Sequence, residues 1–229
     1  QPEQDPAHGR SLHRAVPGAE AGVLVTSGVA RAELCPADGE ELAAVLAEAT
    51  SAGERVAVVG HDSRASLGAL IASAQRTLST AALDTVVHYE PGDLTITVGA
   101  GMPLAALSAL LSTNNQRLTA QAYRQAGTVG GLVASAADGA LAAGYGTVRD
   151  VVIGAAIAYT DGSLARARGR VVKNVAGYDL PRLMVGSMGT LGVLSEISFK
   201  LQPAAPRSVS LVAGFASVHD AMEAAAARA

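Results

Sequence analysis

Apolar side chains recur along the chain with two different periods, and the longer period predicts helices. Within residues 38–51 the apolar positions are three and four residues apart, as on one face of a helix: Leu42, Val45, Leu46 and Ala49. Pro103 and Ser217 each precede a run of strong helix formers, and both residue types are typical of helix starts. The sequence therefore predicts helices over residues 38–51, 104–111 and 217–229.

Shorter apolar runs between turn residues predict strands. The turn sequences Pro91-Gly92-Asp93 and Asp161-Gly162 each separate two such runs, so two hairpins are expected. Helices and strands are mixed without strict alternation, which favours an α+β fold over a doubly wound parallel sheet. The predicted strands are residues 29–34, 55–59, 85–90, 94–98, 151–159, 163–166, 193–201 and 207–215.

Composition narrows the class of protein. The chain has 229 residues, enough for one large domain or two small ones. Its 17 Lys and Arg against 20 Asp and Glu exclude a strongly basic nucleic-acid binder, and 3% aromatics leave few rings for stacking on bases. The single Cys35 excludes a disulfide framework within the chain. No apolar run reaches the ~18–20 residues of a membrane span.

The 25 glycines include those of three loops that are candidate binding elements. The first loop, residues 60–64, directly follows a predicted buried strand. The second loop, residues 127–131, precedes a helix predicted near Val129, whose free N–H groups would point at a phosphate. The third loop, residues 186–192, has three glycines at a spacing of three and continues into a strand. Spacing alone leaves one alternative open for each loop. The first loop can be an ordinary strand-ending turn, the glycines of the second can serve tight helix packing, and the third can be a β-bulge with turns.

Several common motifs are absent from the sequence. The third loop differs from G-x-G-x-x-G and is not followed by a predicted helix, so a Rossmann site is excluded. There is no G-x-x-x-x-G-K-[ST] motif and no G-x-S-x-G elbow, which removes a P-loop and a serine hydrolase. No His, Asp or Glu cluster has metal-ligand spacing, so no metal site is expected.

The loops and their order resemble a known family. Residues 83–107, 126–162 and 170–203 are similar to the FAD-binding domain of the vanillyl-alcohol oxidase / p-cresol methylhydroxylase (PCMH-type) superfamily. KNVAGYDL followed by GSMGTLGV, within residues 173–193, carries most of the resemblance. Within the superfamily, the chain looks most like the FAD-binding subunit of bacterial glycolate oxidase and, more loosely, D-lactate dehydrogenases.

The resemblance implies a domain organisation. Residues 1–27 are expected to be a flexible leader, and residues 28–204 a PCMH-type FAD-binding domain. Its two α+β subdomains are expected at about 28–90 and 91–204, with FAD extended between them. Residues 205–229 resemble the first elements of a truncated substrate or cap domain.

The resemblance also implies the cofactor-binding residues. The first loop is expected to hold the diphosphate, the second loop to hold the diphosphate and the ribityl chain from the opposite side, and the third loop to line the adenosine or the ring end of FAD. Tyr145, Gly146 and Asp150 match a pattern that fixes the second loop, while residues 174–179 match a segment near the flavin. The expected cofactor-binding residues are Gly60, His61, Asp62, Ser63, Arg64, Thr128, Val129, Gly130, Gly131, Tyr145, Asp150, Tyr178, Gly186, Gly189, Thr190, Gly192 and Val193.

The first loop departs from the family pattern, because only Gly60 is present where two or three glycines are usual. One interpretation is a degenerate loop that binds FAD weakly. The other is a covalent bond between flavin and His61, as in the berberine-bridge branch, and an imidazole nitrogen is a competent nucleophile. The rest of the chain resembles the glycolate-oxidase branch, which favours non-covalent FAD.

The implied function is an FAD-dependent oxidoreductase or a subunit of one, oxidising a small 2-hydroxy acid by hydride transfer to flavin. The alternative is a non-catalytic structural subunit with a vestigial flavin site that pairs with a catalytic homologue. Expected partners are oxidase or iron–sulfur subunits, and a cytoplasmic location, peripheral to the inner face of the membrane through partners, goes with them. No catalytic residue is assigned, since those of the superfamily come largely from the cap domain.

Overall fold

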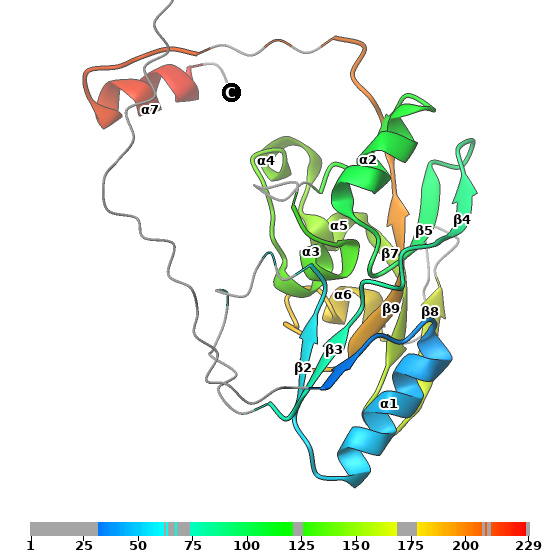
Figure 1. Cartoon of the computed structure of the whole chain (residues 1–229). Coiled ribbons are helices and arrows are strands. Elements are labelled where there is room, and N and C mark those ends of the chain that lie inside the picture. The colour runs from blue at the N-terminus through cyan, green and yellow to red at the C-terminus, as the bar shows by residue number, and fades with distance from the viewer. Residues whose placement is uncertain are drawn as a thin grey trace, which may run out of the picture. The chain divides into compact units, whose positions relative to one another are not determined.

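A computed structural model describes residues 32–61, 63, 67, 74–120, 126–168, 178–207, 209 and 212–227. All of them belong to one compact unit, residues 31–229. Three sheets, of three, five and two strands, and seven helices make up the described part of this unit, and Figure 1 traces their order along the chain. The following elements are those of the described residues.

The first sheet is small and parallel. Its strands are β1 (Ala32–Leu34), β2 (Val56–Val59) and β3 (Arg76–Ser79), in the order β1-β3-β2. Helix α1 (Gly39–Ser51) connects β1 to β2. The side chain of Asp38 caps this helix by accepting a hydrogen bond from the Glu41 N–H at 2.8 Å, which explains why the helix begins where the apolar spacing begins.

The second sheet has five antiparallel strands in the order β4-β5-β9-β7-β8. They are β4 (Val86–Glu90), β5 (Thr95–Gly99), β7 (Val152–Ala158), β8 (Leu164–Arg168) and β9 (Val193–Lys200). Gly162, at φ +85°, makes the turn between β7 and β8. Strand β9 lies in the centre and pairs with β5 on one side and β7 on the other.

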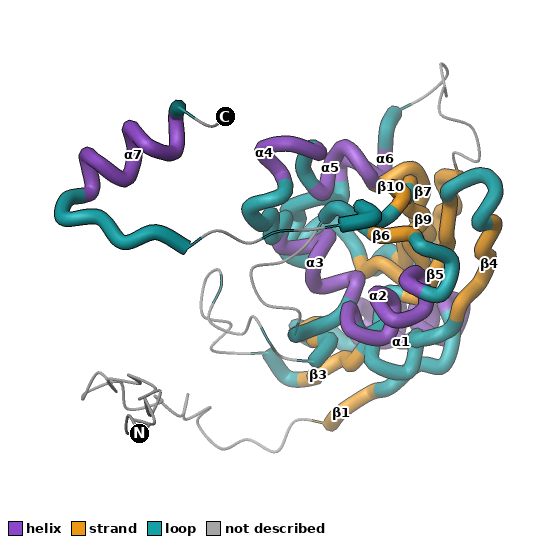
Figure 2. The backbone as a smooth tube through the Cα atoms, turned by 90° about the horizontal axis from the view of Figure 1, so that it is seen from above, coloured by secondary structure: helices purple, strands orange, loops and turns teal. Residues whose placement is uncertain are grey.

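The larger core lies between the second sheet and several helices (Figures 1 and 2). These helices are α2 (Leu104–Ser112), α3 (Val129–Ser135), α5 (Val148–Val151) and α6 (Leu180–Leu183). Fully buried side chains from both layers fill it: Ile96, Leu107, Leu132, Ile157, Ile197 and Phe199. Three elements complete the fold: α4 (Ala142–Tyr145), and the paired short strands β6 (Gln116–Arg117) and β10 (Gln202–Pro203).

A smaller core joins α1 to both sheets. Leu42 and Leu46 of α1 pack with Leu78 of β3 and with Ala158 and Val193 of the second sheet. The helix therefore buries one apolar face against strands that are far apart in the sequence.

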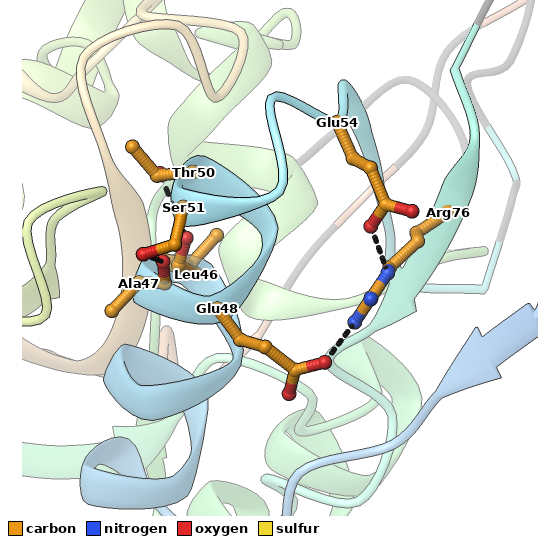
Figure 3. A network of polar contacts seen from close by, with 7 residues as sticks. All are labelled: Leu46, Ala47, Glu48, Thr50, Ser51, Glu54 and Arg76. Atoms are coloured by element: carbon orange, nitrogen blue, oxygen red, sulfur yellow. Dashed lines mark hydrogen bonds and ion pairs between the residues drawn. The ribbon is translucent and has the colours of Figure 1, made fainter.

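Arg76 fastens the C-terminal end of α1 to β3. Figure 3 shows its guanidinium pairing with Glu48 of α1 at 3.0 Å and with Glu54, which follows the helix. In the same turn the hydroxyls of Thr50 and Ser51 donate to the carbonyls of Leu46 and Ala47, at 2.8 and 2.9 Å. The open carbonyls at the helix end are satisfied by a glycine turn: Gly53, at φ +66°, donates to the Thr50 carbonyl at 3.0 Å, and Glu54 donates to the Ala49 carbonyl at 2.9 Å.

The expected α+β class is confirmed, and most expected elements are present. The helix predicted at 217–229 is α7 (Val218–Ala226), which Ser217 caps by accepting from the Asp220 N–H. The strand predicted at 207–215 is wrong, because residues 207, 209 and 212–215 are not in a strand. Val209 and Val212 are 84% and 99% exposed, so neither packs on a neighbour as a strand would.

The expected limits of the domain and its subdomains stay predictions. Strand β4 hydrogen-bonds β5 of the second sheet, although it precedes residue 90, where the subdomain boundary was placed. In the described part of the chain, no helix has both the length and the apolar character that crossing a membrane requires.

The first prediction concerns a close backbone contact between the two sheets. A Cβ atom at Gly101, just after β5, would lie 2.0 Å from the carbonyl oxygen of Thr80, just after β3. We expect Gly101→Ala to lower the free energy of unfolding by about 2 kcal/mol or more, because backbone atoms must move. Urea denaturation followed by circular dichroism measures this. Gly144→Ala is the matched control, since nothing lies within 4 Å of its Cβ position, and unchanged or higher stability is expected there. Equal effects of both variants would contradict the prediction.

The second prediction concerns an ion pair between α1 and β8. Arg166 donates to Glu40 at 2.5 Å and holds the pKa of that carboxyl below its ordinary value. A lowered carboxyl pKa stabilises the fold above the unfolded pKa, and this contribution is lost as pH falls through the folded pKa. We therefore expect Glu40→Gln to lower Tm slightly at pH 7, with an effect that shrinks and disappears as pH falls through the lowered pKa of Glu40 in the folded chain. Glu33→Gln, an exposed change on β1, is the control. A Tm difference that persists in acid would exclude the ion pair as its cause.

Candidate functional site

The first loop begins at the carboxyl end of β2, where ligands of parallel sheets commonly bind. Gly60 follows the strand directly, and Thr80, after the neighbouring β3, donates its N–H to the Val59 carbonyl at 2.8 Å. His61 and Ser63 are exposed. Asp62 and Arg64, two further expected binding residues, lie outside the described residues. The covalent alternative at His61 therefore remains untested.

The second loop lies against the first. A Cβ atom at Gly60 would be 2.4 Å from the Thr128 hydroxyl oxygen and 3.0 Å from its methyl carbon. Only glycine is accommodated at position 60, because Thr128 is buried with 1% exposure and its hydroxyl caps α3 by accepting from the Gly131 N–H at 3.2 Å. The structure thus brings the first two loops together through one glycine–threonine contact.

The first N–H groups of α3 are not free, contrary to the expectation for this helix. Val129 donates to the Met102 carbonyl at 2.9 Å and Gly130 to the Ala100 carbonyl at 2.7 Å. Since Gly131 donates to the Thr128 side chain, all three groups are bonded within the chain. Gly130 also has no room for a Cβ, which would lie 2.9 Å from that of Ala100. Tight packing of α3 against Ala100 therefore explains the glycine at position 130. This is the alternative that the spacing of the second loop left open.

The third loop is bonded to the other end of α3. Gly186 donates to the Val133 carbonyl at 3.0 Å and Met188 to the Ala134 carbonyl at 2.8 Å. Positive φ angles at Gly186 (+80°), Gly189 (+75°) and Gly192 (+149°) explain why glycines recur there every three residues. The Cβ position of Gly189 is 3.9 Å from the Cβ of Val58 in β2, so the third loop also approaches the strand that carries the first loop.

Individual residues of the third loop have different surroundings. The Thr190 hydroxyl donates to the Ser187 carbonyl at 2.6 Å and closes the turn. The Ser187 hydroxyl is buried and has no partner in the described part of the chain. A Cβ atom at Gly192 would lie 2.8 Å from the Ile157 side chain of β7, and Val193 is 4% exposed in the smaller core. A ligand could meet Val193 only through its backbone.

Asp150 and Gly146 hold one turn together. The Asp150 carboxylate accepts from the Thr147 N–H and hydroxyl, both at 2.8 Å, and these bonds lower the pKa of Asp150. A Cβ atom at Gly146, which has φ +85°, would lie 3.0 Å from the same side chain. The link from this turn to the segment after α3 is Asp138, which accepts from the Val148 N–H at 2.6 Å. Sequence reasoning missed Asp138, although an aspartate two to three residues after a small-residue helix is a common turn former.

Two tyrosines were expected near the flavin. Tyr145 is at the end of α4, and its ring lies under the Arg117 guanidinium, 4.5 Å from the centroid. Tyr178 is 95% exposed and is followed by Asp179, which caps α6 by accepting from the Arg182 N–H. Asn174 and Gly177, from the same expected segment, lie outside the described residues.

The three loops together suit an elongated ligand that is either uncharged or anionic. Backbone turns predominate, Cβ atoms at Gly186 and Gly189 would make ordinary contacts with Ala136 and Val58 at 3.6 and 3.9 Å, and the Ser187 hydroxyl has no partner among the described residues. Among the described residues, no three His, Cys, Asp or Glu side chains gather as a metal site. These features match a dinucleotide held largely by backbone and small side chains, as the sequence suggested for FAD.

The chain was compared with known proteins. The model of the FAD binding domain family matches residues 30–168. Glycolate oxidase subunit GlcE of Escherichia coli is 42% identical over 67% of this chain and 44% of that protein. D-2-hydroxyglutarate dehydrogenase of Xanthomonas citri is 35% identical over 78% of this chain and 38% of that protein. D-lactate dehydrogenase of Archaeoglobus fulgidus is 30% identical over 82% of this chain and 42% of that protein.

Among solved structures, alkyldihydroxyacetonephosphate synthase superposes with a TM-score of 0.65 over 77% of this chain and 34% of that one. Their 20% identity makes this a likeness of fold alone. The chain spans less than half the length of each of these relatives. The family match covers more than half of the chain and agrees with the fold and with the three loops. The chain belongs to the FAD binding domain family of PCMH type, and FAD is its cofactor.

Proposed function

We propose that the chain is the FAD-binding part of an oxidoreductase that oxidises a small 2-hydroxy acid. The observation that carries the proposal is the convergence of the three loops on α3 and β2, where Gly60 touches Thr128 and the third loop bonds Val133 and Ala134. The names of three relatives support the substrate class, because glycolate, D-lactate and D-2-hydroxyglutarate are all 2-hydroxy acids.

The first loop and the third loop would hold most of the cofactor. Residues around Gly60 and Ser63 would bind the diphosphate, and the third loop, with Gly186, Gly189 and Ser187, would line the rest. When bound, the flavin would supply the acceptor for a hydride from the carbon that carries the substrate hydroxyl, and loss of the hydroxyl proton would leave a 2-oxo acid. The chain's own contribution would be the placement of the cofactor by its loops.

The relatives also suggest assembly. Since GlcE is named as a subunit of glycolate oxidase, this chain is proposed to work with oxidase or iron–sulfur partner subunits that pass on the electrons. Residues 28–204 are proposed as the FAD-binding domain and residues 205–229 as the first part of a substrate domain.

A second candidate function is a structural subunit whose flavin site is vestigial. It is favoured by the single glycine of the first loop and by the N–H groups of α3 that are already bonded within the chain. The two candidates differ in one measurable property, the binding of FAD.

The third prediction is that the purified chain takes up FAD and releases it on denaturation. Added FAD should give the two visible absorption bands of protein-bound flavin, and the flavin should pass a filter that retains the unfolded chain. A heat-unfolded sample is the control for uptake. A colourless protein after incubation with FAD would favour the structural subunit. Flavin that stays with the unfolded chain would reveal a covalent bond at His61.

The fourth prediction tests the contact between the first two loops. Gly60→Ala should weaken FAD binding at least tenfold, because its methyl group would displace the Thr128 side chain from its position in the site. Thr128→Ala removes the two clashing atoms, although it also removes a helix cap worth about 1 kcal/mol. The double variant should therefore lose less FAD affinity than the two single variants combined. Fluorescence titration of FAD measures all four proteins, with Gly144→Ala as control. Strict additivity would contradict the contact.

A further inference from the structure

Met188, in the third loop, has a backbone conformation that long side chains rarely adopt. The Ser187 carbonyl accepts from the Thr190 N–H at 2.9 Å, which closes a four-residue turn. Both central residues of this turn have positive φ angles, +52° at Met188 and +75° at Gly189. Turns of this kind favour Asn, Asp or Gly at the first central position, because positive φ strains other side chains. Glycine or asparagine at position 188 would therefore relieve strain that the methionine imposes.

The other non-glycine residues with positive φ in the described part of the chain are explained by the fold. Asn115 belongs to a residue type that tolerates this conformation. Ala136 ends α3 as its C-cap and has a small side chain. Leu94 is partly buried against the larger core. Met188 differs from all three, because it is 46% exposed and belongs to neither core. Packing in a core therefore does not offset its strain.

The turn that carries Met188 lies among the elements of the candidate site. The Met188 N–H donates to the Ala134 carbonyl of α3 at 2.8 Å, so this helix fixes the backbone at the strained position. On the next residue, the Cβ position of Gly189 is 3.9 Å from the Cβ of Val58 in β2. The turn is thus held between the helix that follows the second loop and the strand that leads into the first loop.

Few side chains of the three loops could cover a flat ring. Residues 60–64, 127–131 and 186–192 include no Phe, Tyr or Trp. Among their larger apolar residues Val129 is fully buried, whereas Met188 and Leu191 are 46% and 48% exposed. A thioether is polarisable and makes favourable contacts with aromatic rings at about 5 Å. Of the two exposed side chains, Met188 is the one whose backbone is strained, and strain that persists in a loop indicates a functional constraint.

We propose that the thioether of Met188 packs on a flat heteroaromatic ring of FAD, and that this contact is the reason why a strained methionine occupies the turn. The proposal rests on the proposed placement of FAD beside the three loops. FAD has two such rings, the adenine and the isoalloxazine, and both offer a thioether the same aromatic face. The contact adds affinity and holds the ring in place, so Met188 is a cofactor-binding residue.

The first experiment observes the methionine methyl groups by NMR after labelling with ¹³C at the ε-methyl carbon. The chain has four methionines, and the signal that disappears in Met188→Leu belongs to Met188. Addition of FAD should shift this signal upfield, because a methyl group over the face of an aromatic ring is shielded. Met222 of α7, which is 67% exposed, is the internal control and should not shift. ADP and FMN, added separately, distinguish the adenine from the isoalloxazine.

The second experiment separates binding from stability in the variants. Met188→Gly and Met188→Asn should raise Tm of the FAD-free chain, because both residues accept a positive φ. The same variants should raise the Kd for FAD about threefold to tenfold, because the contact with the ring is lost. Met188→Leu keeps an apolar side chain and should retain more of the affinity. Asn115→Gly is the matched control, since it changes a residue with a similar φ, +51°, outside the three loops, and should leave the Kd unchanged.

Three results would overturn the inference. The first is a chain that binds FAD without a shift of the Met188 methyl signal. The second is a pair of variants, Met188→Gly and Met188→Asn, that bind FAD as tightly as the wild type does. The third is a loss of affinity accompanied by a lower Tm, which would make Met188 a structural residue. A wild type that takes up no FAD contradicts the proposed function itself and is recognised beforehand by its lack of colour.

Discussion

Close contact between backbones, possible only at glycine, is the constraint on which the structure depends. Gly99 and Gly101 at the end of β5 pack on the carbonyls of Leu83 and Thr80, the segment that follows β3, and so join the second sheet to the first. Between these two glycines, the Ala100 carbonyl accepts a hydrogen bond from the Gly130 N–H of α3 at 2.7 Å. These close contacts fix the position of α3, and they therefore also fix the positions of the three loops.

The local elements could be predicted from the sequence because their signals are local. Asp38 before α1, Pro103 before α2 and the Asp161-Gly162 turn each specify a boundary within a few residues. Helices α4, α5 and α6 were missed because each spans four residues, which is too short for a periodic pattern. The strand expected at residues 207–215 is the opposite error, because an element was predicted that does not form. β-branched residues favour a strand only where a neighbouring strand is present.

The candidate site was predictable in part. Glycine positions in the first and second loops identified the right segments, but the physical reason differs, because Gly60 and Gly130 make room for Thr128 and Ala100. A sequence does not reveal whether a glycine faces a ligand or another backbone.

The central place of β9 has a consequence for the order of folding. Strand β9 is the last of the five strands to be synthesised, and it lies between β5 and β7; its Ser198 bonds Thr97 across 101 residues of sequence. Until β9 emerges from the ribosome, the hairpins β4-β5 and β7-β8 each have one unpaired edge that exposes apolar residues such as Ile96 and Ile157. Contacts between such distant segments form slowly, and unpaired edges attract other chains. During biosynthesis, the nascent chain is therefore most vulnerable to aggregation in the interval between the completion of β8 and the arrival of β9.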